Sequence, residues 1–345
     1  MSERRLSRMW HLMAWVSLLG VVAGWIMITG LGDRVWWALP ILFGPRWLWL
    51  LFVGGIVPCI VVTPRRGVPL AVVAALIATF GIMDWRLGLG RFVRASGVQV
   101  WVMPLNAGAG SSIPQSPRIL DEIRRVDADV VVITECGASL PAALQTMSAT
   151  YSVRIAKETS NCLLAKGTIT GWWERDPTDA FKQNGSGAIQ RAEVLLPQGA
   201  VRLGLVHLAT PRQALQEFRD ISQIPSLGEL TRRNTVEREE ESEHAVEWID
   251  RGAPMPLIIA GDFNLPIESA IYWRNWSRFR NAFSEVGWGP GYTKHTRWWG
   301  IRIDHVLSSI DVRPLQSYVG HDVGSDHLPL IASLALPAGP AGSTR

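Results

Sequence analysis

Polar residues of a few types stand at the ends of short apolar runs throughout the C-terminal two thirds of the chain. The set comprises Asn106, Glu135, His207, Asp262, Asn264, Asp304, Asp326 and His327. Strand ends hold side chains at one edge of a rigid scaffold, where binding and catalytic residues gather. Taken alone, Asn106 or the GDFN stretch is better explained as a helix cap or a turn. The whole set is better explained by a functional site.

The residue types in this set indicate a hard metal ion and acid–base chemistry. Carboxylate and amide oxygens suit Mg²⁺ or Mn²⁺, and such an ion binds phosphate oxygens and stabilises a charged leaving group. An Asp–His pair supplies acid–base or electrostatic help. The three cysteines have no zinc-site spacing and exclude a disulfide framework, and we interpret Cys136 as a small buried residue. The sequence contains neither a Walker loop nor a G-x-S-x-G elbow, which argues against a P-loop NTPase and a serine hydrolase.

The elements that must position this set read as one mixed α/β domain over residues 98–335. Strands are predicted at 98–105, 129–134, 162–166, 188–196, 201–207, 257–260, 302–308 and 328–333. Helices are predicted at 117–126, 139–147 and 231–250. The acidic run from Glu237 to Glu247 is interpreted as a solvated helix face. Residues 336–345 are predicted to be a disordered tail.

Six motifs in this region are similar to those of the endonuclease/exonuclease/phosphatase superfamily, whose members have the deoxyribonuclease-I-like fold. They appear in the family's order as LNAG (105–108), DADVVVITEC (127–136), LVHL (205–208), GDFNLP (261–266), RIDHVL (302–307) and GSDHLPL (324–330). Bacterial members with leading membrane helices resemble the whole chain. The resemblance implies a four-layer α/β sandwich, in which two packed β-sheets are flanked by helices. It also implies cleavage of a phosphoester by direct attack of water, with a divalent metal as cofactor.

The resemblance assigns the metal to one group of residues. Glu135 matches the principal metal ligand, Asn106 matches the neighbour that helps to place the metal, and Asp326 supports the metal or the histidine. Many nucleases of the family carry Asn or Asp where this chain has Gly108, which leaves the site one ligand short. Asn184 is a candidate for a further phosphate contact, although a turn explains it better.

The resemblance assigns catalysis to a second group. Asp262 and Asn264 match the pair that positions the attacking water and the phosphate. His327 matches the histidine on the scissile phosphate, and Asp304 matches its orienting carboxylate. His207 matches a phosphate-contacting histidine. Either Asp262 or His327 could be the general base.

The first 97 residues have the composition of a membrane anchor. They contain three long apolar segments, at about 10–31, 47–63 and 68–84, and 22 residues from Trp10 to Leu31 lack Asp, Glu, Lys and Arg. At about 1.5 Å per residue such a helix is long enough to cross a bilayer core of about 30 Å. The anchor carries a net charge of +7, and the remainder of the chain carries −3. The domain is therefore not predicted to be a nonspecific nucleic-acid binder.

The basic residues beside these segments predict the orientation of the chain in the membrane. Arg4, Arg5 and Arg8 precede the first span, and Arg65 and Arg66 stand between the second and third. The positive-inside rule places both groups in the cytoplasm, so three spans put the domain on the extracytoplasmic side of the cell membrane. Arg86, Arg91 and Arg94 follow the third span and argue the other way. If the third segment does not cross, the domain is cytoplasmic.

Together these features predict a multi-pass, membrane-anchored phosphoesterase that acts on a phosphomonoester or phosphodiester with Mg²⁺ or Mn²⁺. One alternative is a nuclease, which would need a basic, aromatic-lined groove. The stretches Trp273–Arg280 and Arg297–Trp299 could supply one, although core or lipid packing of their tryptophans is favoured. Another alternative is a non-catalytic, membrane-bound binding module. The predicted partners are a phosphoester substrate and the lipid bilayer.

Overall fold

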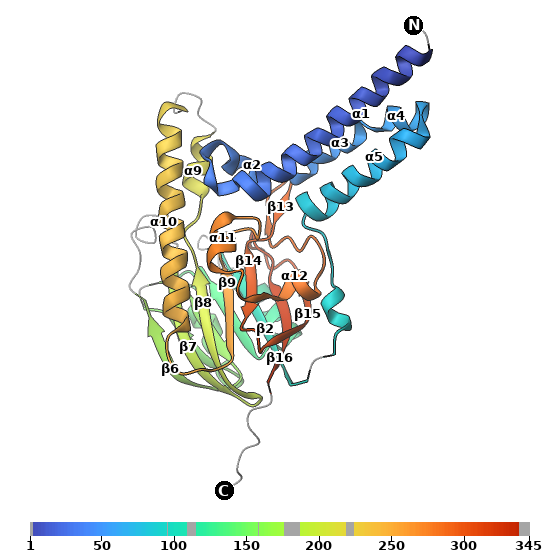
Figure 1. Cartoon of the computed structure of the whole chain (residues 1–345). Coiled ribbons are helices and arrows are strands. Elements are labelled where there is room, and N and C mark those ends of the chain that lie inside the picture. The colour runs from blue at the N-terminus through green and yellow to red at the C-terminus, as the bar shows by residue number, and fades with distance from the viewer. Residues whose placement is uncertain are drawn as a thin grey trace. The chain divides into compact units, whose positions relative to one another are not determined.

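The computed structural model (Figure 1) describes residues 3–94, 96–108, 115–157, 159–175, 187–218 and 224–337. The chain forms two compact units. Unit 1 comprises Met1–Trp85, Glu268–Ala270 and Arg297–Trp299. Unit 2 comprises Arg86–Ile267, Ile271–Thr296 and Gly300–Arg345. Two short loop segments from late in the chain are thus part of the N-terminal unit.

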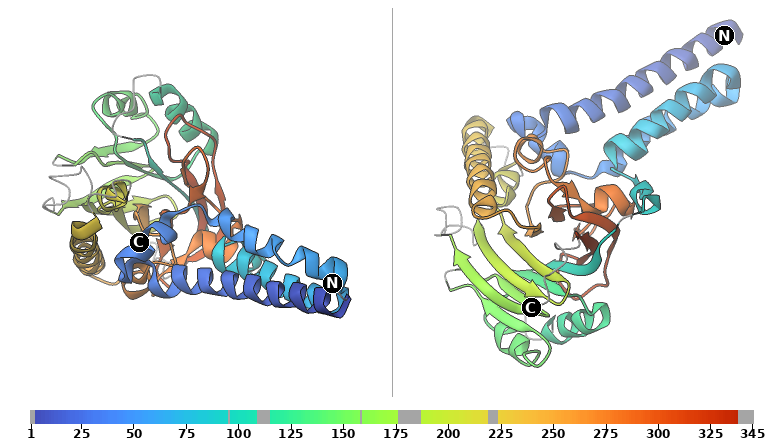
Figure 2. Two further views of the ribbon diagram at one scale, coloured as in Figure 1. Left: turned by 90° about the horizontal axis from the view of Figure 1, so that it is seen from above. Right: turned by 60° about the horizontal axis from the view of Figure 1, so that its bottom comes forward.

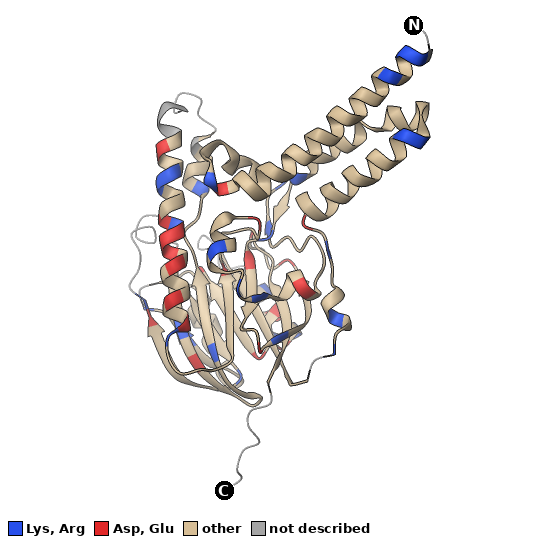
Figure 3. Ribbon diagram, viewed as in Figure 1, with Lys and Arg blue, Asp and Glu red and all other residues tan. Residues whose placement is uncertain are grey.

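Unit 1 is built of apolar helices. They are α1 (Glu3–Ile26, continued by the π-helix η1, Met27–Leu31), α2 (Leu39–Phe43), α3 (Leu50–Gly54), α4 (Val57–Val62) and α5 (Pro64–Leu76, continued by the π-helix η5, Ile77–Ile82). Two helical stretches, Arg4–Arg34 and Pro64–Ile82, are long and apolar enough to cross a membrane. A third span is possible if the pair Trp36–Phe43 and Arg46–Val62, bent by 94°, crosses as one. Charged residues lie at the ends of these helices (Figure 3).

Two buried charged groups of unit 1, Arg46 and Asp33, have hydrogen-bond partners in the segment Glu268–Ala270. Arg46 donates to both carboxylate oxygens of Glu268, at 2.5 and 2.9 Å, and both side chains are less than a tenth exposed. Asp33 accepts hydrogen bonds from the hydroxyl of Ser269 and from the backbone N–H of Ala270. Removing one partner of a buried ion pair is destabilising, because the other charge would stay buried without a partner. The segment Glu268–Ala270 is therefore an integral part of this unit.

Unit 2 contains two six-stranded mixed sheets. The first has the order β15-β16-β2-β3-β5-β4, and the second has the order β10-β14-β9-β8-β7-β6. The strands of the first sheet are β2 (Val98–Asn106), β3 (Val130–Thr134), β4 (Ser152–Ile155), β5 (Cys162–Ala165), β15 (Arg313–Val319) and β16 (Leu330–Leu336). Those of the second are β6 (Thr168–Glu174), β7 (Ala188–Leu196), β8 (Gly199–His207), β9 (Leu257–Asp262), β10 (Arg280–Asn281) and β14 (Asp304–Ser308). Each sheet has one parallel pair, β2 with β3 and β8 with β9.

The two sheets pack face to face with helices outside them, which confirms the predicted four-layer sandwich (Figure 2). Alternate residues of both sheets meet in a central core that includes Val102 and Val132 from one sheet and Leu203 and Ile258 from the other. The outer face of the first sheet packs against α6 (Gln115–Val126) and α7 (Leu140–Gln145). The outer face of the second packs against α10 (Ile224–Asp250) and α11 (Ala270–Asn275). Two further helices are α9 (Arg212–Glu217) and α12 (Ala282–Val286).

The acidic helix α10 corrects one sequence-based interpretation. Most of its glutamates are exposed, but Glu241 is buried, together with Arg238. Buried positions recur every three or four residues along the helix, as on the packed face of an amphipathic helix. The acidic run is therefore not wholly a solvated face. At the end of the chain, β16 continues to Leu336, and residues 338–345 of the predicted tail lie outside the described residues.

Candidate active site

Strand register brings three of the predicted residues into one row across the second sheet. β8 and β9 run parallel with His207 opposite Asp262. β14 runs antiparallel to β9 with Asp304 opposite Asp262. Parallel pairing in the first sheet likewise places Asn106 opposite Thr134, the residue before Glu135. The predicted site residues therefore lie at matching strand ends, as the sequence pattern indicated.

The turns that follow these strands have an unusual backbone. Glu135 and Asn264 both have positive φ, 52° and 49°. Asn tolerates this left-handed region well, but Glu seldom occupies it. Gly261 has φ 141°, and a Cβ there would stand 2.0 Å from the carbonyl oxygen of Val206. Strained backbone of this kind persists where the surrounding structure holds it, and it is concentrated at functional sites.

Asn106 joins two carboxylates from different strands. Its amide nitrogen donates to Glu135 Oε1 at 3.1 Å and to Asp262 Oδ2 at 2.9 Å. Its amide oxygen accepts from the backbone N–H of Gly108 at 2.9 Å, which fixes the orientation of the group. His207 Nε2 lies 3.5 Å from the same Glu135 oxygen. Asn106 thus orients Glu135 beside the buried row of Asp262 and His207.

His327 stands between two buried carboxylates. Its Nδ1 donates to Asp304 Oδ2 at 2.8 Å, and its Nε2 lies 3.7 Å from Asp262 Oδ2. Burial alone would lower the pKa of His327, but the negative charges of Asp304 and Asp262 hold it above its ordinary value. Burial raises the pKa of Asp262, and the nearby charge of Asp304 raises it further. A carboxylate that accepts from one imidazole nitrogen fixes the tautomer and favours the cation.

Asp326 lies at the edge of this group, next to His327 in the chain. Its exposed carboxylate forms an ion pair with Lys294, a residue of the short strand β12 (Lys294–His295). Burial would raise the pKa of Asp326, but the hydrogen bond and charge of Lys294 hold it below the ordinary value, and Arg212 adds to the effect. Lys294 and Arg212 thus bring positive charge to the rim of the site. Sequence reasoning missed both, because neither stands beside a recognisable motif.

A second layer of residues holds the turns of the site in place. The hydroxyl of Ser325 donates to the backbone oxygen of Asn106 at 2.8 Å and accepts from the N–H of His327 at 3.1 Å. The buried guanidinium of Arg238 donates to the backbone oxygen of Asn264 at 2.6 Å. Asn264 also donates its side-chain amide to the backbone oxygen of Leu208 at 2.9 Å. Asn264 is therefore held by the backbone of Leu208, and its own backbone N–H donates to Asp262 Oδ1.

The site offers a divalent cation two groups of ligand atoms, one at the buried Asp262–Asp304–His327 cluster and one at Glu135. Asp262, Asp304 and His327 offer ligand atoms that all lie within 4.8 Å of one another. Within the part of the chain that the structure describes, Asp304 Oδ1 is buried and has no hydrogen-bond partner. Glu135 has a side chain 22% exposed, whereas those of Asp262 and Asp304 are at most 2% exposed. Mg²⁺ prefers oxygen ligands and keeps several waters, so the more open Glu135 side of the site suits it better.

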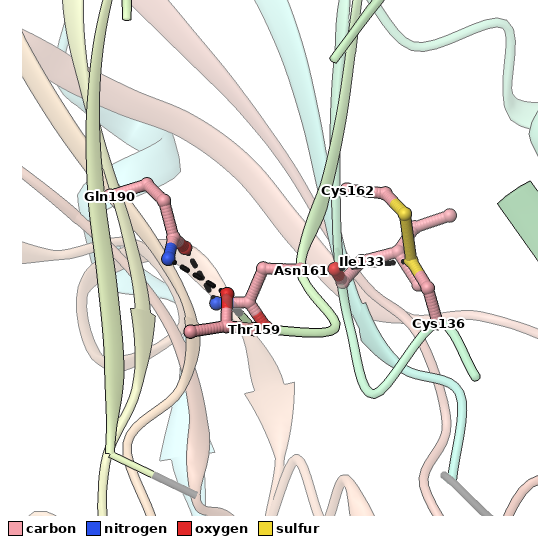
Figure 4. The surroundings of a disulfide bond; sticks show 6 residues. All are labelled: Ile133, Cys136, Thr159, Asn161, Cys162 and Gln190. Carbon is pink, nitrogen blue, oxygen red and sulfur yellow. Dashed lines mark hydrogen bonds between the residues drawn. A yellow bond between two sulfur atoms is a disulfide. The ribbon is translucent and has the colours of Figure 1, made fainter. Parts of the chain in front are cut away.

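The structure contains a disulfide bond that the sequence analysis did not predict. Cys136, directly after Glu135, is bonded to Cys162 at the start of β5, with Cα atoms 6.4 Å apart (Figure 4). The interpretation of Cys136 as buried is confirmed, but it is not simply a small core residue. The neighbouring loop is held as well, because Asn161 donates to Gln190 Oε1 and Gln190 donates to the hydroxyl of Thr159. The disulfide thus holds the turn that carries Glu135, and the hydrogen bonds of Gln190 hold the loop beside it.

The remaining histidines do not join the site. His305 is fully buried and its Nε2 lies 2.8 Å from the backbone oxygen of Leu265. His321 pairs with Glu122 at 3.3 Å. His244 is exposed on α10. Asn184 lies outside the described residues.

In the arginine- and tryptophan-rich stretches several side chains are engaged in other contacts, whereas Trp273 and Trp298 are exposed. Arg274, Arg278 and Arg280 form ion pairs with Glu239, Asp250 and Glu285 respectively. Trp276 is fully buried, with its ring 4.8 Å from that of Phe263. In unit 1, Arg297 lies over the ring of Trp298. Core packing of Trp276 agrees with the favoured sequence interpretation.

Comparison with known proteins agrees with this geometry. The model of the Endonuclease/Exonuclease/phosphatase family matches residues 105–327. No curated protein matches the chain. Among solved structures, D. rerio TDP2 complexed with single strand DNA product aligns with a TM-score of 0.51 at 14% identity, covering 68% of this chain and 98% of that one. The human Nocturnin catalytic domain with bound sulfate anion aligns at 0.50 and 16% (72% and 99%). An endonuclease/exonuclease/phosphatase from Bacteroides vulgatus aligns at 0.50 and 15% (70% and 100%). At these identities the structural likeness establishes the fold.

Proposed function

Because the chain belongs to the endonuclease/exonuclease/phosphatase family, whose members are phosphoric ester hydrolases, we propose that it is a membrane-anchored phosphoesterase. It hydrolyses a phosphomonoester or phosphodiester by direct attack of water, with Mg²⁺ or Mn²⁺ as cofactor. The observation that carries the proposal is the buried arrangement in which His327 lies between Asp304 and Asp262. The adjoining Asn106 joins Asp262 to Glu135.

In this proposal the acid–base work is divided between Asp262 and His327. The hydrogen bond to Asp304 uses Nδ1 of His327 and leaves Nε2 on the side of Asp262. Asp304 favours the imidazolium form, so His327 supplies positive charge to the scissile phosphate. Asp262 then accepts the proton of the attacking water. Asn264 holds the turn after Asp262, through its backbone N–H to Asp262 Oδ1 at 2.8 Å.

Glu135, to which Asn106 donates a hydrogen bond, is the proposed place for the metal, and Asp326 is proposed to support it from the edge of the site. A bound divalent cation would polarise the phosphate and stabilise charge on the leaving oxygen. His207, 3.5 Å from Glu135, is placed to contact the phosphate. Lys294 and Arg212 at the rim would attract an anionic substrate, since positive charge near a site raises the local concentration of anions.

One observation supports anchoring in the membrane, and a second one supports an extracytoplasmic domain. Two or three N-terminal helices are apolar enough to span the bilayer. Disulfides form and persist in oxidising compartments, and the domain contains the bond between Cys136 and Cys162. The cytoplasm would reduce such a bond, so its presence supports the exported orientation.

The nuclease alternative has less support from the described surface. It needs a continuous basic groove with exposed aromatic rings. The arginines nominated for that groove, Arg274, Arg278 and Arg280, are neutralised by ion pairs. The same substrate panel that tests the main proposal decides between them.

The test is hydrolysis by the full-length protein in lipid vesicles, with phosphomonoesters, phosphodiesters and single- and double-stranded oligonucleotides as substrates. We expect turnover of a small phosphoester with Mg²⁺ or Mn²⁺ and none after exhaustive chelation. Glu135→Gln removes a charge from the proposed metal site and should abolish turnover. Glu237→Gln removes an equivalent charge from the exposed face of α10 and serves as the matched control. Full activity after chelation would contradict the proposal, and turnover of oligonucleotides alone would favour the nuclease.

A further inference from the structure

Unit 2 exposes a group of large apolar side chains immediately after the last candidate membrane span. We call this group the juxtamembrane patch. Its members share high exposure on an otherwise folded surface: Leu87 (39%), Leu89 (65%), Phe92 (73%), Val93 (50%) and Trp288 (60%). Exposed apolar groups that cluster in this way mark interaction surfaces, whereas single exposed residues do not.

The patch is held in a defined conformation. β1 (Arg86–Leu87) pairs antiparallel with β11 (Trp288–Gly289), so that Leu87 lies opposite Trp288. The short helix η6 (Leu89–Phe92) follows directly. The guanidinium carbon of Arg91 lies 4.9 Å from the ring centre of Phe92 and 5.9 Å from that of Trp288. These contacts combine segments 200 residues apart in the sequence into one surface of apolar and cationic groups.

The position of the patch in the chain indicates its partner. The last candidate span ends at Ile82, and β1 begins at Arg86. An extended chain covers at most about 3.6 Å per residue, so β1 starts within about 15 Å of the end of that span. The headgroup region is about 5 to 8 Å deep on each side of the hydrocarbon core, so this limit keeps the start of β1 within about two headgroup depths of the core.

We propose that the juxtamembrane patch lies in the interfacial layer of the bilayer, with its aromatic and aliphatic side chains among the upper acyl chains. Its arginines, Arg86, Arg91 and Arg94, contact anionic headgroups. Trp and Phe beside Arg suit this layer, because their rings and stems are apolar while the charge stays at headgroup level. Basic residues near an anionic membrane surface are attracted to it. The inference rests on the proposed membrane anchoring.

This role also accounts for the arginines that opposed the predicted orientation. Arg86, Arg91 and Arg94 follow the third span, where the positive-inside rule disfavours them on the outer side. If they bind headgroups from a folded surface, they are compatible with an exported domain.

The test places an environment-sensitive fluorophore on the patch of the full-length protein in vesicles containing phosphatidylglycerol. The labelled variant is Phe92→Cys in a Cys59→Ser background, because Cys59 is the free cysteine and Cys136 and Cys162 are bonded to each other. Leu89→Cys is the second patch position, in case Phe92→Cys fails to fold. Ile310→Cys, 75% exposed in the turn between β14 and β15, is the control.

We expect the patch label to emit at shorter wavelength than the control label. It should be quenched several-fold more by headgroup-nitroxide lipid and several-fold less by aqueous iodide. Equal iodide quenching at the patch and control positions would overturn the inference. Shielding from iodide without quenching by the nitroxide lipid would also overturn it, and would indicate a protein partner. Carbonate extraction separates the membrane anchoring from the interfacial contact of the patch. If the protein stays in the membrane after extraction while iodide quenches the patch label, the anchor is present and the interfacial contact is not.

Discussion

Asn106 joins two acidic residues that come from different sheets. Its amide donates to Glu135 and to Asp262, which would otherwise repel one another across the site. Unlike an acidic residue, an amide can satisfy both carboxylates without adding charge. The residue therefore determines where the carboxylate of Glu135 points. In metal sites, partners that orient the ligands are nearly as important as the ligands themselves.

Asn106→Ala should weaken metal binding more than it weakens turnover at saturating metal. Loss of a ligand-orienting partner commonly reduces metal affinity by about 10- to 100-fold. Mn²⁺ binding followed by electron paramagnetic resonance on the full-length protein would measure the change. Asn275→Ala on α11, whose amide donates to the backbone oxygen of Ile271, serves as the control. Unchanged Mn²⁺ affinity in Asn106→Ala would remove Asn106 from the site.

For single residues, the sequence was enough to predict which side chains stand at strand ends. It was not enough to predict side-chain partners that only the folding of distant segments brings together. Asn106, Glu135, His207, Asp262, Asp304 and His327 could be nominated because each ends or begins an apolar run. The ion pair of Lys294 with Asp326 could not, because Lys294 stands in a polar loop. The disulfide could not be predicted either, since two buried cysteines 26 residues apart look the same whether bonded or free.

At the scale of elements, the strands missed by the sequence analysis include the outer strands of the sheets. β4, β6 and β15 form three of the four sheet edges. An edge strand need not be apolar on both faces, and β15 alternates buried and exposed residues around a register shift near Pro314. The central strands read clearly because both of their faces are covered, by the other sheet and by helices.

The disulfide should contribute measurably to stability, because it closes the loop that contains β4. For a loop with a sequence separation of 26, the chain-entropy account gives about 3 to 4 kcal/mol. In a domain of this size that corresponds to a fall in melting temperature of about 10 °C. Thermal unfolding of a Cys136→Ser, Cys162→Ser double variant in detergent would measure it, with Cys59→Ser as control.

A thiol count provides an independent check on this prediction. The unfolded wild-type protein should react with one equivalent of thiol reagent before reduction and three after it. Three reactive thiols before reduction would show that the bond does not form.

At the scale of the whole molecule, the charge is divided between the two parts of the chain. The first 97 residues carry +7 and the rest −3. In the structure the apolar helices of unit 1 carry their arginines at the ends, and unit 2 holds the acidic site. The division of charge is counted directly from the sequence, and the lengths of the apolar runs predict the membrane spans. It did not predict that Glu268–Ala270 and Arg297–Trp299 belong to unit 1, since only tertiary contacts such as that of Arg46 with Glu268 reveal it.

The exported orientation predicts the behaviour of a reporter fused after Ser96. Alkaline phosphatase, which is active only outside the cytoplasm, should be active at this position. The positive-inside rule keeps the basic flanks of the spans in the cytoplasm, and these flanks contain Arg4, Arg5, Arg8, Arg65 and Arg66. A fusion to a reporter that fluoresces only in the cytoplasm should be dark. The opposite pair of results would place the domain in the cytoplasm.

Replacement of His327 tests most directly whether the buried Asp–His–Asp arrangement performs phosphoester hydrolysis. A positioned acid, base or charge is commonly worth about 10²- to 10⁴-fold in rate. On the best substrate of the panel, His327→Ala should therefore lower kcat by at least about 100-fold, while Mn²⁺ affinity changes little. Asp304→Asn acts through the same imidazole, so the double variant should be much less impaired than the product of the two single effects. If His327→Ala kept the wild-type kcat, the proposed site would be wrong at its centre.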